Sequence, residues 1–311
     1  MINALIDASA RNRFLVLLLV FFATAWGVRA MFRVPLDAIP DLSDPQVIVF
    51  SEWPGRSPQL VEDQITYPIV SSLLSAPKVK AVRGQSMFGD SFVYVIFEDG
   101  TDIYWARSRV LEYMQGISGK LPEGVTPTLG PDATGVGWVY QYALVDESGQ
   151  QSLADLRSVQ DWSLRYWLQS VPGVAEVASV GGFVKQYQVN VDPNRMLGYN
   201  ITLRTVIEAI RRSNNDVGGR TIEIAGAEHV VRGLGYIKSL ADIEMIPVAT
   251  NGNGTPILVR DLATVTLGPD LRRGIATLDD KGEVVGGIVV MRYGENALNV
   301  IRAVKAKLKE I

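Results

Sequence analysis

The hydrophobic pattern changes character once along the chain, at residues 14–32, where FLVLLLVFFATAWGVRAMF is almost continuously apolar. At ~1.5 Å per helical residue this run reaches ~28 Å, close to the ~30 Å thickness of a bilayer core. Ala23-Thr24-Ala25 also fits the small-x-small pattern of a cleaved export signal. Apolar residues continue past that site, and Arg29 can extend its guanidinium to the headgroups. We therefore favour a retained membrane helix.

Charged residues at the two ends of this run indicate its orientation. Arg11 and Arg13 precede it, whereas the chain beyond Arg33 becomes acidic at Asp37 and Asp41. The positive-inside rule then predicts a cytoplasmic N-terminus, with the residues after about 33 outside the cytoplasm.

Beyond the apolar run, alternating and helical patterns predict an ordered series of elements. Ser57-Pro58 is a good helix start, because Ser caps free N–H groups and Pro at the first helical position gives up no hydrogen bond. Pro68 should kink or divide that helix near Tyr67. The series is a strand at 46–53, a helix from 58, two strands around the turn at 88–90, and a helix at 102–117.

The same order of elements then begins again after a Gly-rich connector, LGPDATGVGW. A strand at 138–147 and a helix carrying Leu153 to Leu168 are followed by two strands within 171–192. Ala76-Pro77-x-Val79-x-x-Val82 and Val171-Pro172-x-Val174-x-x-Val177 occupy the same place in the two series. This agreement favours an internal duplication of a ferredoxin-like β-α-β-β-α-β unit.

The second series is longer than the first. A short helix carrying Leu203 to Ile210 precedes a stretch rich in turn residues, in which 214–228 is predicted to form a projecting β-hairpin. Strands at 256–268, 272–278 and 283–293 and a helix from about Asn296 follow. The predicted fold class is therefore α+β, with one N-terminal transmembrane helix and two related soluble halves.

Composition excludes several classes of function. The net charge is −3, from 30 Lys and Arg against 33 Asp and Glu, without a basic block that would bind nucleic acid. The chain has no cysteine for thiolate metal sites, one histidine, His229, and no phosphate-binding P-loop. We assign no catalytic, cofactor-binding or metal-ligating residue. Arg83, beside Gly84, could line a path for ions or form a structural salt bridge.

Several long motifs identify a resemblance to a known family. They are NRFLVLL, PLDAIPDLSDPQVIV, VEDQITYPI, VRGQSMFGDSFVYVIFEDGTDIYWARSRVLEY, LGPDATGVGW, ADLRSVQDW, VPGVAEVASVGGFVKQYQV and LRRGIATLDDKGEVVGG. In order and spacing they resemble the heavy-metal efflux branch of the resistance-nodulation-division transporters. The resemblance implies a proton-driven homotrimeric pump in the inner membrane of Gram-negative bacteria, joined to a periplasmic adaptor and an outer-membrane channel. Its substrate would be a metal ion, it would contact membrane lipid, and no cofactor is implied.

Family members are much longer, so we expect this chain to be their N-terminal piece. The family's methionine cluster and intramembrane proton relay would then lie downstream of it. The resemblance implies these parts: 1–13 cytoplasmic N-terminus; 14–33 transmembrane helix 1; 34–133 first porter subdomain; 134–180 second porter subdomain, first part; 181–269 docking subdomain with projecting hairpin; 270–311 second porter subdomain, second part.

The resemblance also suggests candidate functional residues. Arg83 would line the porter cleft, and the helix at 102–117, with Asp102, Arg107 and Arg109, would line the trimer axis. The hairpin at 214–228 matches the family's intersubunit docking loop.

The motifs MFGDSFVYVIFEDGTD and GVGW are most similar to copper/silver pumps, whereas zinc/cobalt relatives tend to carry Glu where Trp138 stands. Copper/silver members can carry Met before the Arg-Arg pair, where this chain has Leu271, which cannot ligate metal. We expect a Cu(I)/Ag(I) pump. A divalent-cation (Zn/Co/Cd) pump of the same family and a short single-span periplasmic binding or scaffold protein are the alternatives.

Overall fold

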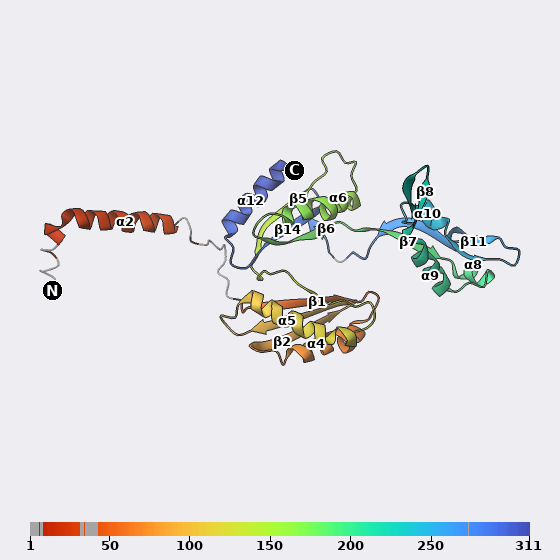
Figure 1. Ribbon diagram of the computed structural model, residues 1–311, viewed down its shortest axis with the longest axis horizontal. Helices are drawn as coiled ribbons and strands as arrows, with labels where there is room; N and C mark the ends of the chain where they lie inside the picture. The colour runs from red at the N-terminus through yellow and green to blue at the C-terminus, as the bar shows by residue number, and fades with distance from the viewer. Residues whose placement is uncertain (1–5, 7–8, 32–33, 35–42, 273) are drawn as a thin grey trace. The chain divides into compact units, whose positions relative to one another are not determined.

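The structure is a computed structural model that describes residues 6, 9–31, 34, 43–272 and 274–311 (Figure 1). Helices and strands are mixed along the chain, in agreement with the predicted α+β class. The chain divides into two compact units. The first comprises Met1–Ala143, Asp161–Ser179 and Gly286–Ile311, and the second comprises Leu144–Gln160 and Val180–Val285.

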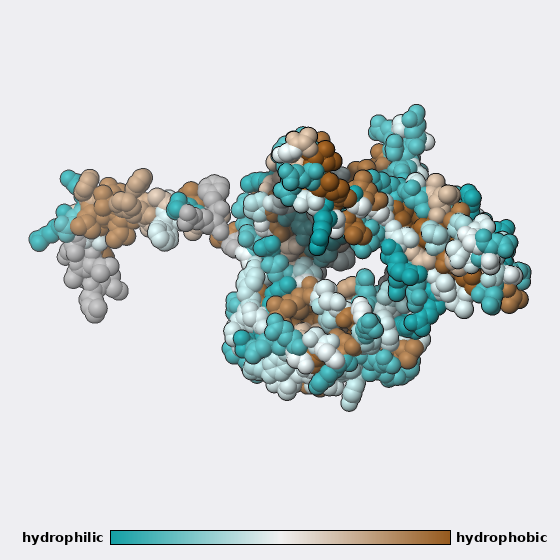
Figure 2. All heavy atoms as spheres, turned by 45° about the vertical axis from the view of Figure 1, so that its right-hand side comes forward, coloured by the Kyte–Doolittle hydropathy of each residue, from teal (hydrophilic) through white to brown (hydrophobic). Residues whose placement is uncertain are grey.

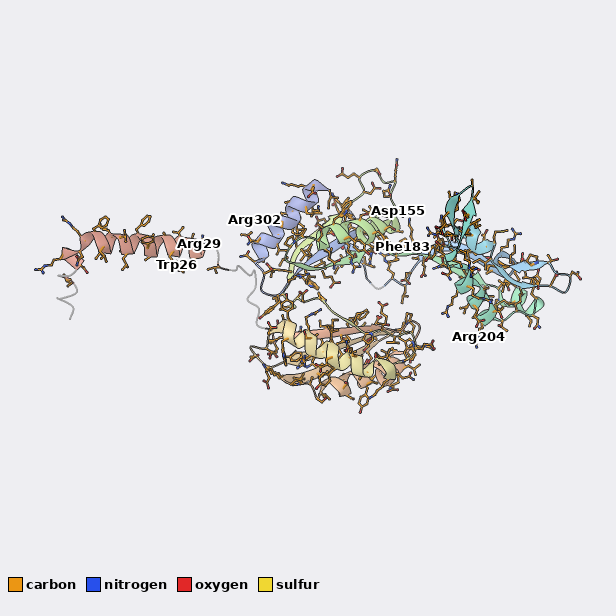
Figure 3. The ribbon with its side chains drawn as sticks, in the orientation of Figure 1. Trp26, Arg29, Asp155, Phe183, Arg204 and Arg302 are labelled. Atoms are coloured by element: carbon orange, nitrogen blue, oxygen red, sulfur yellow. The ribbon has the colours of Figure 1, made fainter. Side chains whose placement is uncertain are left out.

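The apolar run forms helix α2, Arg13–Met31, whose 19 residues leave no side chain buried. The helix consists almost entirely of apolar residues, the side of it seen in Figure 2 is largely brown, and such a helix suits a lipid environment. Trp26 and Arg29 lie near its C-terminal end (Figure 3). Within the described part of the chain, α2 is the one helix long and apolar enough to cross a membrane. The last residues of the predicted span, 32 and 33, lie outside that part.

The first sheet has the strand order β2-β3-β1-β4. Its strands are β1 (Gln46–Glu52), β2 (Val79–Met87), β3 (Asp90–Phe97) and β4 (Thr128–Leu129), and helices α4 (Tyr67–Leu73) and α5 (Ile103–Ile117) belong to the same half. Alternate strand residues and one face of each helix form a single core that includes Val47, Val49, Val93, Val95, Phe97, Ile69, Leu73, Val110 and Met114. Because side chains alternate across a strand, the intervening residues lie on the opposite face of the sheet.

The predicted helix after Ser57 runs to Leu73, and its α-helical pattern is interrupted just before Pro68 by a π-helical turn. Helix α3 (Pro58–Val61) begins with the Ser57 cap, whose Oγ accepts from Leu60 N at 3.4 Å. A π-helical turn, η1 (Glu62–Thr66), then leads directly into α4, and Pro68 is the second residue of α4. The second half has the same construction: α6 (Leu153–Val159), the π-helical turn η3 (Gln160–Leu164) and α7 (Arg165–Gln169).

The second sheet is organised around β14 (Glu283–Met291), which pairs with β13 (Ala276–Thr277), β5 (Trp138–Leu144) and β6 (Val174–Gly181). Helix α12 (Ala297–Glu310) follows β14, capped by Asn296, whose side chain accepts from Asn299 N. A third cluster of buried residues forms the core of this half: Leu168, Val171, Val174, Val177, Val289, Val300 and Val304.

The segment between β6 and β13 forms a separate core within the second unit. A two-stranded ribbon of β7 (Lys185–Val191) and β12 (Ala263–Pro269) leads into it. Its other elements are α8 (Pro193–Gly198), α9 (Leu203–Ser213), α10 (Leu240–Glu244), α11 (Val259–Leu262), β10 (Pro247–Thr250) and β11 (Pro256–Leu258). The hairpin of β8 (Val217–Ile224) and β9 (Ala227–Gly233) is exposed on both faces, and it extends beyond the predicted 214–228.

The structure adds the strand partners to one sequence-based prediction and corrects another. The two strands predicted within 171–192 both exist, but β6 pairs with β14 and β7 pairs with β12, because alternation alone does not identify a strand's partner. The single strand predicted at 256–268 is interrupted by α11. There the Asp261 carboxylate accepts from Leu258 N at 2.8 Å, which stabilises a helical turn.

The two turns that carry the repeated Pro motif have the same geometry. Lys78 and Gly173, which follow the prolines, both have positive φ, of 61° and 85°. The backbone hydrogen bonds match as well: Ala76 N to Leu73 O at 3.1 Å, Val171 N to Leu168 O at 3.1 Å, Val79 N to Ala76 O at 3.4 Å, and Val174 N to Val171 O at 3.1 Å.

This turn yields a stability prediction. A Cβ at Gly173 would lie 2.7 Å from Val300 Cγ2, so Gly173→Ala combines backbone strain with a clash in the core and should lower the free energy of unfolding by about 2–3 kcal/mol. Gly124 has the same φ of 85° and open space around it, so Gly124→Ala is the matched control, with an expected loss of about 1 kcal/mol. Denaturant unfolding in detergent measures both. Equal losses would contradict the assigned contact with Val300.

Candidate functional site

Arg83 lies on the face of the first sheet opposite its helices. Its neighbours across the sheet are Tyr94 on β3 and then Ile48 on β1. The adjacent row places Phe92 beside Phe50, with ring centroids 4.8 Å apart. The sheet therefore presents the Arg83 guanidinium beside a strip of half-buried apolar and aromatic side chains.

The Arg83 side chain is exposed and forms no hydrogen bond or ion pair with any residue that the structure describes. The alternative of a structural salt bridge is therefore not observed within that part of the chain. Glu52 and Asp90 share the same face, but they pair in the row of Met87, four residues along β2 and so ~13 Å away along the strand. A guanidinium in this setting can bind a carboxylate or another anion by a two-pronged contact, and it repels a bare cation.

The three candidate residues of α5 each have a partner within the first unit. Asp102 is the N-cap, and its Oδ1 accepts from Trp105 N at 2.7 Å. Arg107 donates from Nη1 to Gly130 O at 2.8 Å, and Arg109 Nη1 lies 2.6 Å from Glu112 Oε2. These contacts organise the helix and its surroundings, and Arg83 lies on the opposite face of the sheet.

The outward face of α5 has a different composition. Tyr104 and Leu111, one heptad apart, are 51% and 50% exposed, and Ser108 and Gln115 lie between and after them on the same side. This face can pack against another helix, whereas the opposite face is committed to the core of the first half.

The base of the β8–β9 hairpin is held by one carboxylate. Asp216 Oδ1 accepts from Gly235 N at 2.9 Å, and its Oδ2 forms an ion pair with Arg232. The backbone N–H of Gly235 and then the Arg232 guanidinium hold the pKa of Asp216 below its usual value. The stabilisation is therefore complete above the ordinary Asp pKa and is lost as the pH falls through the lowered value.

The described residues contain no group of three or more His, Cys, Asp or Glu side chains arranged to hold a metal ion. The methionines are spread over separate elements, with Met114 buried in the first core and Met87 and Met245 exposed. Trp138 and Leu271, which bear on the choice of metal, are 63% and 65% exposed.

Sequence reasoning missed two polar residues that organise the chain, Asp132 and Asp216. Asp132, in the connector, lies 3.8 Å from Arg292 Nε and accepts from Tyr104 Oη at 3.2 Å. Its position in a Gly-rich segment was a weak signal, and its two partners are separated from each other by most of the chain.

Comparison with known proteins gives concordant matches along the chain. The family model described as AcrB/AcrD/AcrF family matches residues 5–311. The chain is 56% identical over 311 residues to the cation efflux system protein CusA of Escherichia coli K12, covering all of this chain and 30% of that protein. It is 40% identical over 318 residues to the cobalt-zinc-cadmium resistance protein CzcA of Cupriavidus metallidurans, again covering 100% of this chain and 30% of the relative.

A solved structure gives the same result for the fold. A crystal structure of a heavy metal efflux pump superposes with a TM-score of 0.87 at 33% identity, over 98% of this chain and 30% of that one. The chain thus spans about 30% of the length of the proteins that it matches. Because the family model covers nearly every residue, the chain belongs to the AcrB/AcrD/AcrF family, and the predicted resemblance to its heavy-metal efflux branch is confirmed.

Proposed function

We propose that this chain is the N-terminal part of a proton-driven metal-cation efflux pump that exports Cu(I) or Ag(I) across the Gram-negative envelope. The observation that carries the proposal is the 56% identity to a cation efflux protein over all 311 residues. The pump is a secondary transporter rather than an enzyme. The substrate, the proton coupling and the partners belong to the complete protein.

The copper/silver assignment has two supports. The identity to CusA, at 56%, exceeds the 40% identity to a protein named for cobalt, zinc and cadmium resistance. Trp138, where zinc/cobalt relatives tend to carry Glu, offers an indole in place of a hard carboxylate. Leu271 argues the other way, since it replaces a thioether with a side chain that cannot ligate metal.

The first and second halves are proposed to be duplicated ferredoxin-like porter subdomains. Matching features support this: the Pro turns, the π-helical turns η1 and η3, and helices whose N-cap lies two residues after a positive-φ Gly, Asp102 after Gly100 and Asn296 after Gly294. In this proposal the first porter subdomain is 34–133, the second is 134–180 with 270–311, and the docking subdomain is 181–269.

The proposed membrane topology places helix α2 across the inner membrane, within 14–33, with residues 1–13 in the cytoplasm and residues after about 33 in the periplasm. The length and fully exposed apolar surface of α2 support this placement. Arg29, close to the far end of the helix, can reach the headgroups (Figure 3).

The complete pump is proposed to act as a homotrimer with a periplasmic adaptor and an outer-membrane channel. Helix α5 would line the trimer axis with its outward face, which carries Tyr104 and Leu111. The β8–β9 hairpin would dock on a neighbouring subunit, which agrees with aliphatic side chains exposed on both of its faces, such as Ile222 at 50% and Val230 at 75%. Arg83 would line the porter cleft.

The metal assignment is tested by resistance. A Gram-negative strain that lacks its own metal pumps, expressing the complete pump with its adaptor and channel, should grow at higher copper and silver concentrations than the parent. The 311-residue segment alone should give no protection and serves as the control. Protection against zinc and cobalt alone would identify the divalent alternative. A reading frame that stops directly after Ile311 would favour the scaffold alternative.

Arg83 gives a second prediction. In the complete pump Arg83→Gln should reduce copper or silver transport by roughly tenfold, because the cleft loses the contact of a guanidinium with a carboxylate, a loss equivalent to about 1.4 kcal/mol. The melting temperature should stay unchanged because Arg83 is exposed. Arg211 on α9 is also exposed and forms no hydrogen bond or ion pair with a described residue, so Arg211→Gln is the matched control and should transport normally. Equal transport by the two variants would contradict the proposal that Arg83 lines the porter cleft.

The hairpin gives a third prediction. In the 311-residue chain, Asp216→Ala should accelerate hydrogen exchange of the β8 and β9 amides, because the base of the hairpin loses both Gly235 and Arg232. The melting temperature of the core should stay the same. Lowering the pH through the depressed Asp216 pKa should likewise reduce the protection of these amides in the unsubstituted chain, measured as the exchange rate relative to the intrinsic rate at each pH.

Glu228→Ala removes an exposed carboxylate from the same hairpin and is the control. In the complete pump, Asp216→Ala should lower the trimeric fraction seen by native mass spectrometry, and Glu228→Ala should leave it intact. A normal trimeric fraction for Asp216→Ala, together with faster exchange, would exclude the hairpin as the intersubunit contact.

A further inference from the structure

The connector between the first and second halves, residues 130–137, is fastened to helix α5 on one side. Arg107 Nη1 donates to Gly130 O at 2.8 Å, and Tyr104 Oη donates to Asp132 Oδ2 at 3.2 Å. Both donors come from the first turns of α5, so the start of this helix and the start of the connector are tied together.

The same connector is fastened to the end of β14 on the other side. Asp132 O accepts from Tyr293 N at 2.9 Å, and the Arg292 guanidinium Nε lies 3.8 Å from Asp132 Oδ2. Arg292 also donates from Nε to Val174 O at 3.2 Å, so its head is held against β6. Asp132 therefore contacts α5 through its carboxylate, and the two residues that directly follow β14 through its carboxylate and its backbone.

The Asp132 side chain is only 16% exposed, whereas that of Arg292 is 50% exposed. Limited access to water strengthens the electrostatic attraction between this carboxylate and its two partners, Arg292 and Tyr104. Burial and then the Asp132 charge raise the pKa of Tyr104, so the phenol keeps its proton and remains a donor at neutral pH.

Without these contacts the connector would be a poor mechanical link. It contains Gly130, Gly135 and Gly137, and a chain this rich in glycine behaves as a flexible joint. Gly137 is itself held, since Met291 N donates to Gly137 O at 2.7 Å. The stiffness of the joint must therefore come from bonds to its neighbours, and Asp132 is the residue that bonds to both halves.

We infer that Asp132 is a positioning residue that couples helix α5 of the first half to β14 and α12 of the second half. This role goes beyond the proposed transport function and does not depend on it, because every contact that carries it lies within the first unit. A movement of α5 would reach the Asp132 carboxylate through Tyr104 and would pass from Asp132 to the chain after β14 through its carboxylate and its backbone carbonyl.

The absence of cysteine from the sequence allows a direct test by spin labelling. Labels are placed on the 311-residue chain at Gln115→Cys on α5 and Arg302→Cys on α12, both exposed, and Arg302 projects from α12 in Figure 3. The labelled chain in nanodiscs, diluted with unlabelled chain to remove contributions between copies, should give one narrow distance distribution by double electron–electron resonance.

Asp132→Ala should broaden that distribution. Asp132→Asn keeps an acceptor for Tyr104 but loses the charge that faces Arg292, and Tyr104→Phe removes only the bond to α5. Each should broaden the distribution less than Asp132→Ala does. Far-UV circular dichroism establishes that each variant is folded, and if Asp132→Ala fails to fold, the two milder variants carry the test.

Glu123→Ala removes an exposed carboxylate without a partner in the described chain, from the loop after α5, and should leave the distribution narrow. The inference is wrong if the folded Asp132 and Tyr104 variants keep the parental distribution. It is equally wrong if Glu123→Ala broadens the distribution as much as they do, because the effect would then reflect general loosening of the chain.

Discussion

Burial of one helix face against one sheet face is the constraint on which the rest of this structure depends. In the first half, alternate residues such as Val93 and Val95 of β3 pack against Ile69 of α4 and Val110 of α5. Burying each such side chain stabilises the fold by about 1.5–3 kcal/mol, more than a cap or an exposed ion pair contributes. Since helices cover only one face, alternation sends Arg83, Tyr94 and Phe92 to the other. The candidate site is thus a consequence of how the core is made.

Much of the fold could be predicted from the sequence, because hydrophobic periodicity and the residues that begin or interrupt helices are local signals. Ser57, Asp102 and Asn296 cap helices where the pattern places them, and a π-helical turn interrupts the α-helical pattern just before Pro68. Strand partners could not be predicted, since β7 alternates equally well whether it pairs with β6 or with the distant β12. Short elements such as α11 also escaped, because a single turn depends on one side-chain contact, here that of Asp261.

The candidate site shows the same division between local and distant information. Arg83 could be singled out as a charge beside Gly84, but its neighbours Tyr94 and Ile48 come from two other strands and become visible only through the register. Asp132 and Asp216 were missed because their roles depend on partners outside their own segments. The substrate and the proton coupling depend on residues outside this sequence, since the chain spans about 30% of the length of its relatives.

The two π-helical turns indicate the order of events in the evolution of the chain. Such a turn accommodates one extra residue inside a helix and is otherwise rare, because it weakens the regular ladder. Here η1 follows Val61 in the first half and η3 follows Val159 in the second, each in the helix that precedes the Pro turn. Under the proposed duplication, a shared rarity at the same place is inherited rather than acquired twice. The extra residue then entered the ancestral half before that half was doubled, which makes the insertion older than the two-halved protein itself.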